Sequence, residues 1–146
     1  MNGTTSSNLT PDLALDLDDA VLAEVAVLTI NHPATGKPTS STVTIAGPEH
    51  PTRKALLFKR MRTKRTELQK TGTIAMTDPE DDKADETALI AECTLAWSLT
   101  RGGQPLAFTP AAARELYADP RWSWLRDQVL NGLDARELFI SGSAQA

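Results

Sequence analysis

The last third of the chain, residues 97–139, places the strongest constraint on the fold. It contains all three tryptophans and the single tyrosine of the sequence, and such large rigid side chains must either form a core or contact a partner. Thr109-Pro110 and Asp119-Pro120 each combine an N-cap residue with a proline at the first helical position. The segment therefore predicts short capped helices that carry aromatic side chains. We expect them over residues 111–118, from Pro120 to Asn131-Gly132, and, as a last turn, over residues 134–139.

Two short β-branched runs, residues 24–30 and 42–46, stand earlier in the chain. Their partial alternation of apolar and polar residues is typical of strands. The segment between them, residues 32–38, is rich in turn-forming residues, and Gly47-Pro48 ends the second run. These features predict an antiparallel β-hairpin with a long connection.

Residues 52–71 show the periodicity of a helix. Apolar residues recur there at three- and four-residue spacing, and Gly72 is a suitable C-terminal stop. The apolar positions are Leu57 or Phe58, Met61 and Leu68, with the stem of Lys64 or Arg65 between them.

A second long helix is predicted to start at Asp78, as N-cap, with Pro79 in the first turn. Its first turns are acidic, which the helix dipole favours. Leu89, Cys93 and Trp97 lie at four-residue steps, so this helix is expected to continue to about Leu99.

The expected fold is α+β, with a small N-terminal antiparallel hairpin or meander followed by a mainly helical part. By range, we predict a disordered N-terminus at 1–10, a hairpin region at 11–50, a helical region at 51–140 and a flexible tail at 141–146. In the alternative, the hairpin forms a separate lobe on a flexible joint.

The composition narrows the class of protein. The net charge is -4, which argues against a dedicated nucleic-acid binder, and a single cysteine excludes an internal disulfide. The N-terminus lacks the basic and apolar regions of a secretory signal, and no apolar run approaches the roughly 18–20 residues of a membrane helix. We expect a soluble intracellular protein that does not bind membranes.

The helix at 53–70 is strongly basic, with Arg60 and Lys64 near its centre and Glu67 as its one acidic residue. Three interpretations remain open. The basic residues form a solvated face balanced by the chain's own acidic segment at 78–86, they bind an acidic protein partner, or they bind the phosphates of a nucleic acid.

No catalytic, cofactor or metal site is expected. His32 and His50 lie in loops without a second ligand at metal spacing, and the acidic run 78–82 lacks the spacing of an EF-hand. Cys93 falls on the apolar face of its helix, as a buried inert thiol would. Residues 34–37 resemble a phosphate loop only superficially, because they precede a strand and lack its full frame. An enzyme is therefore the least expected class.

The aromatic residues of the last third are the remaining candidates for a binding surface. Tyr117, Trp122, Trp124 and Phe139 either form the core or contact a partner. Trp122 and Trp124 are two residues apart, so on one helix they point in different directions. We expect one of the two to be exposed or at an interface.

Several short motifs together resemble the tail assembly chaperones of long-tailed bacteriophages. The resemblance covers residues 25–139 and rests on two groups of motifs. The first is residues 32–38, then Ile45-Ala46-Gly47-Pro48, then the basic helix. The second is Trp97, the Gly102-Gly103 turn, Leu106-Ala107-Phe108-Thr109, Leu116-Tyr117, Pro120 with Trp122, Gln128-Val129 and Phe139. Trp124 stands where the family pattern has an apolar residue of any type.

The resemblance implies a non-enzymatic protein of the bacterial host cytoplasm. It would bind the tape measure protein, assist recruitment of tail tube subunits and leave before the tail is complete; self-association is also compatible with it. Two other functions remain open, a structural tail or connector subunit and a nucleic-acid-binding regulator that uses the basic helix.

Overall fold

The computed structural model describes residues 14–72 and 79–140. The expected disordered N-terminus, the flexible tail and the N-cap at Asp78 lie outside the described residues.

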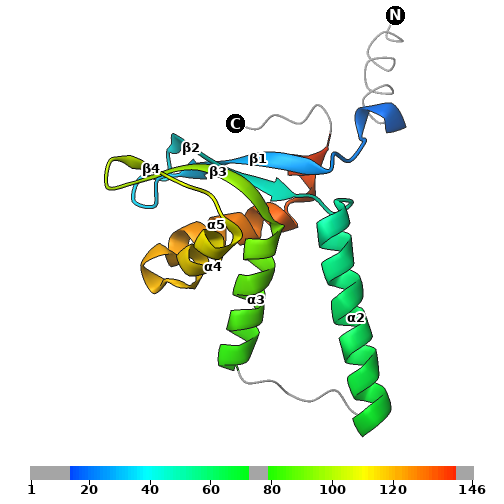
Figure 1. Cartoon of the computed structure of the whole chain (residues 1–146). Coiled ribbons are helices and arrows are strands. Elements are labelled where there is room, and N and C mark those ends of the chain that lie inside the picture. Colours follow the sequence, from blue (N-terminus) through cyan, green and yellow to red (C-terminus); the bar gives the residue numbers. More distant parts are fainter. Residues whose placement is uncertain (1–13, 73–78, 141–146) are drawn as a thin grey trace, which may run out of the picture.

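The centre of the fold is a four-stranded antiparallel sheet in the order β1-β2-β3-β4. Its strands are β1 (Val25–Asn31), β2 (Pro38–Ala46), β3 (Thr94–Arg101) and β4 (Gln104–Leu106). Figure 1 shows the α-helices gathered on one side of this sheet. The α+β class is confirmed.

The N-terminal hairpin is confirmed and belongs to the same sheet as the later strands. β1 pairs with β2, where Val27 lies opposite Thr44. On its other side β2 pairs with β3, so that Val43 lies opposite Trp97. Because this second pairing joins the hairpin to the rest of the chain, the alternative of a separate hairpin lobe is wrong.

The predicted end of the acidic helix is corrected by the structure. Helix α3 (Pro79–Cys93) stops at Cys93, and β3 follows without a break. Residues 94–100 fit both periods, because Leu95, Trp97 and Leu99 also alternate with more exposed Ala96 and Ser98. The ladder with β2 selects the strand. The range 51–140 therefore contains two strands as well as helices, and the tight β3–β4 turn uses Gly102 and Gly103, both at positive φ.

The other helices follow their capping signals. Besides α3, the long elements are α2 (Pro51–Thr71), α4 (Pro110–Ala118) and α5 (Ser123–Asp134), and the 3-10 turns are η1 (Leu17–Asp19), η2 (Pro120–Trp122) and η3 (Arg136–Phe139). Gly72 ends α2 in the left-handed conformation, and its N–H donates to the Leu68 carbonyl. Thr109 caps α4 by accepting from the Ala112 N–H, and Asp119 caps η2 through the Arg121 N–H.

Asn131-Gly132 does not end its helix, which is a second correction. Gly132 is buried inside α5, where a Cβ would lie 3.0 Å from Leu28 Cδ2 and 3.3 Å from Ile45 Cδ1. The glycine therefore permits a close approach of the helix to the sheet and does not serve as a stop signal.

One core joins the sheet to the helices. Its largest fully buried side chains are Val43, Ile45, Ile90, Cys93, Tyr117, Val129 and Phe139. Tyr117 and Phe139, which the sequence offered as partner contacts, are thus core residues, and this part of the prediction is corrected. Among the described residues no helix has the length and apolar character needed to cross a membrane.

The close packing around Gly47 leaves no room for a larger side chain. A Cβ at this position would lie 2.8 Å from the Ala23 carbonyl oxygen and 2.8 Å from Phe139 Cδ1. Because a backbone oxygen cannot rotate away, we expect Gly47→Ala to lower the free energy of unfolding by about 1–3 kcal/mol. Urea denaturation of both proteins measures this, and an unchanged midpoint would contradict the packing at Gly47.

Candidate partner-binding surfaces

Helix α2 is attached to the body mainly at its N-terminal end. Arg53 donates from Nη1 to the Ala46 carbonyl (3.1 Å) and from Nη2 to the Leu133 carbonyl (2.8 Å). Leu56 packs against the core as a partly buried side chain. No residue of α2 is buried, and the helix extends from the body beside α3 (Figure 1). Most of α2 is therefore available for contact with another molecule.

The apolar face of α2 is exposed, although its spacing is typical of a face that packs on a core. Leu57, Phe58, Met61 and Leu68 are 56%, 52%, 49% and 48% exposed. Lys64 and Arg65 lie between Met61 and Leu68 and are also exposed. We call these six residues the α2 stripe. It combines apolar contact area with positive charge.

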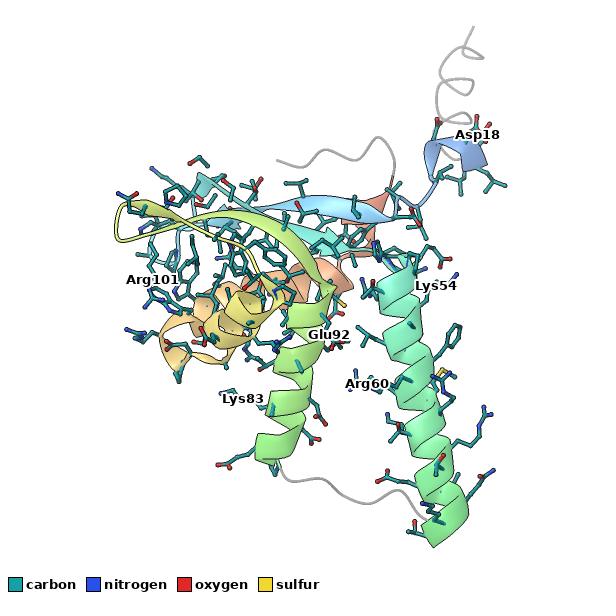
Figure 2. All side chains as sticks on the ribbon, viewed as in Figure 1. Asp18, Lys54, Arg60, Lys83, Glu92 and Arg101 are labelled. Carbon is teal, nitrogen blue, oxygen red and sulfur yellow. The ribbon has the colours of Figure 1, made fainter. Side chains whose placement is uncertain are left out.

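Arg60 and Lys64, the two basic residues for which the sequence allows a partner contact, lie four residues apart and are neighbours on the surface of α2. Lys64 belongs to the α2 stripe, and Arg60 borders the stripe on the side of the helix that faces α3 in Figure 2. Arg60 is also three residues from Leu57, so both basic residues lie next to exposed apolar residues.

An arginine of α5 forms an ion pair with one of the acidic residues of α3. Arg126 donates from Nη1 to Glu86 Oε1 at 2.9 Å, and this arginine is mostly buried. On α2, Lys54 pairs with Glu49 at 3.1 Å with both side chains exposed, so that pair contributes little stability. Arg126 was not anticipated from the sequence, because its partner lies 40 positions earlier in the chain.

Trp122 and Trp124 line one pocket, and this corrects the expectation that they diverge. Trp122 belongs to η2 and Trp124 to α5, so the two are not on one regular helix. Both are partly buried. The pocket has a volume of about 180 Å³ and lies between the turn end of the sheet and the C-terminal helices. Its apolar walls also include Ile30, Leu99, Leu106, Leu116 and Leu125.

Charged groups surround the ring of Trp122. The guanidinium carbons of Arg101 and Arg121 lie 5.7 Å and 5.6 Å from its centroid, within cation–π range. Arg121 is held by Asp119, and the hydrogen bonds from the Arg121 side chain and backbone lower the pKa of Asp119 to about 2. The Trp122 Nε1–H is buried and has no hydrogen-bond partner among the described residues. The sequence did not point to Arg101, because its strand was expected to be helix up to Leu99.

The polar atoms of Trp97 and Tyr117 form hydrogen bonds within the protein, and the Trp97 ring packs against another aromatic ring. Trp97 Nε1 donates to the Leu106 carbonyl at 2.8 Å, and its ring meets Phe108 edge-on at 4.9 Å between centroids. The Tyr117 hydroxyl lies 2.9 Å from Thr94 Oγ1. Burial raises the pKa of Tyr117 to about 12, while the hydrogen bond to Thr94 opposes part of that rise.

The raised pKa of Tyr117 predicts a loss of stability at high pH. The neutral phenol is favoured in the folded state, so its contribution is complete below the ordinary value of 10 and is lost as the pH rises from 10 to about 12. We expect a loss of about 2–3 kcal/mol over this window. Tyr117→Phe should lack this component, so the difference between the two unfolding free energies is the measurement. A constant difference from pH 9 to 12 would contradict the burial of the phenol.

The described residues offer no grouping suited to metal chemistry. No cluster of three or more His, Cys, Asp or Glu side chains occurs among them. His32 Nδ1 accepts from the Ala34 N–H inside the hairpin loop, as a turn residue would. Cys93 is buried, and desolvation raises the pKa of its thiol, which disfavours the reactive thiolate.

Comparison with known proteins identifies no relative: no protein-family model, curated protein or solved structure matches this chain.

Proposed function

We propose that this chain is a tail assembly chaperone of a long-tailed bacteriophage, which binds the tape measure protein and assists recruitment of tail tube subunits. It acts in the host cytoplasm as a binding protein and not as an enzyme. The proposal combines the motif resemblance with one structural observation, the exposure of the α2 stripe on a helix that extends from the body.

The α2 stripe suits a helical client. An amphipathic helix binds a complementary surface through apolar residues at i, i+3, i+4 and i+7. Leu57 and Met61 are four residues apart, and Leu68 follows seven residues after Met61 on the same face. A tape measure protein, which the resemblance implies to be long and largely helical, would present such apolar faces before the tail forms around it. Lys64 and Arg65 would select faces that carry acidic residues and would speed encounter more than they raise affinity.

The apolar content of the stripe favours a protein partner over nucleic acid. Phosphate binding depends on charge and gains little from Leu57, Met61 or Leu68. A structural tail or connector subunit would use the same kind of surface but would remain in the particle.

Co-expression with the phage's tape measure protein tests the proposal. We expect a higher soluble yield of the tape measure protein and co-purification of the two chains. Mass spectrometry of mature virions should not find this chain, because a chaperone leaves. Its presence in particles would favour the structural subunit. Unchanged solubility together with no co-purification would reject the chaperone function.

A further inference from the structure

A short acidic arm precedes the first strand. We define it as residues 14–21; its base is fixed by a bridge between Leu22 and Ile140 and by the Ala23 N–H, which donates to the Phe139 carbonyl. Leu15, Leu17 and Val21 are 72%, 76% and 53% exposed, among the highest values for large apolar residues in the described part of the chain. Leu15 and Leu17 alternate with Asp16 and Asp18, and Asp19 follows.

The acidic arm has local structure. Asp16 caps the 3-10 turn η1, because its Oδ1 accepts from the Asp18 N–H at 3.0 Å. The turn therefore holds Leu17 and the following aspartates in one short, defined element. Two apolar side chains and three carboxylates are therefore exposed within five residues.

The arm and the α2 stripe are complementary in chemistry. The arm presents leucines among aspartates, and the stripe presents Leu57, Met61 and Leu68 among Lys64 and Arg65. Both are exposed, and together they account for most of the exposed large apolar residues of the described chain. We propose that the acidic arm of one copy of this protein docks on the α2 stripe of a second copy.

The direction of the arm favours docking on α2 of a second copy over docking on α2 of the same copy. The arm and α2 leave the same end of the sheet in opposite directions, with Asp18 above that end and Lys54 below it in the view of Figures 1 and 2. To reach its own stripe, the arm would have to reverse direction at Leu22 and Ala23, where the backbone is held by Ile140 and Phe139. Exchange between two copies keeps this base intact.

Reciprocal exchange would form a closed pair. Each copy offers one arm and one stripe, so a two-fold axis satisfies both contacts and leaves neither surface open. The inference goes beyond the proposed function, because it concerns the free protein. The arm would cover the stripe until a client helix displaces it.

Sedimentation velocity of the full chain, without any client, tests the inference. We expect a concentration-dependent dimer that weakens with added salt, since the paired charges are exposed. Asp18→Lys/Asp19→Lys and Lys64→Glu/Arg65→Glu should each raise the dimer dissociation constant about tenfold or more. Asp16 is left unchanged because it caps η1.

The combined charge exchange provides the decisive comparison. A chain that carries Asp18→Lys/Asp19→Lys together with Lys64→Glu/Arg65→Glu again has opposite charges on the arm and the stripe. It should dimerise close to the level of the original chain. Lys59→Glu/Lys70→Glu makes the same change of charge on the opposite face of α2 and should leave the dimer unaffected.

Three outcomes would overturn the arm exchange. They are a monomer at all concentrations, a dimer insensitive to the charge substitutions, and a dimer that the combined chain does not restore. A monomeric protein that still binds the tape measure protein would reject the exchange and leave the chaperone function standing.

Discussion

Replacement of Phe139 by alanine is expected to lower the free energy of unfolding by about 3–5 kcal/mol. The ring is fully buried at the end of η3. It lies so close to Gly47 that a Cβ on that glycine would collide with it. The loss includes the apolar area of the ring and the cavity that remains, because strands and helices around it cannot collapse completely. Urea denaturation followed by tryptophan fluorescence measures the change.

Phe58→Ala is the matched control for this prediction. It removes the same ring from a site that is 52% exposed, so we expect a change within about 0.5 kcal/mol. Phe139 was one of the residues that the sequence offered as a partner contact. If Phe139→Ala were no more destabilising than Phe58→Ala, the assignment of Phe139 to the core would be wrong.

The triple substitution Leu57→Ser/Met61→Ser/Leu68→Ser should leave the stability of the fold almost unchanged and weaken binding to the tape measure protein. No residue of α2 is buried, so the free energy of unfolding should fall by no more than about 1 kcal/mol, mainly through helix propensity. Affinity for the tape measure protein should fall about 100-fold or more, because three apolar contacts are lost from the stripe. Titration of the purified proteins measures the affinity, and circular dichroism checks the helix.

Lys59→Ser/Arg62→Ser/Lys70→Ser is the control for the triple substitution. It removes three long side chains from other faces of α2 and should preserve most of the affinity. An equal loss from both variants would show that the total charge of α2, and not the α2 stripe, determines binding. Full affinity in the stripe variant would require a different binding surface.

Most capping and turn residues predicted the local structure correctly, because their effects are local. Thr109-Pro110 starts α4 as expected, Gly72 ends α2, and the β-branched runs form the hairpin. Each of these depends on hydrogen bonds or backbone angles within a few residues, which the sequence states directly.

The errors arose where a distant segment decides between two local solutions. Residues 94–99 satisfy a helical and a strand period, and the free edge of β2 selects the strand. Trp122 and Trp124 would point in different directions on one regular helix, but the turn η2 brings both to the same pocket. Gly132 resembled a stop, yet it is the point where α5 approaches Leu28 and Ile45.

By itself, the sequence determined the α+β class, the hairpin, the basic helix and most helix starts, since propensities and caps act over short range. Only the tertiary structure decided which apolar residues are covered. Tyr117 and Phe139 are buried because β3, α4 and η3 meet around one core, whereas Leu57, Met61 and Leu68 remain exposed because α2 leaves the body after its first turns. An amphipathic pattern shows that a helix has an apolar face, but burial of that face depends on whether another element reaches it.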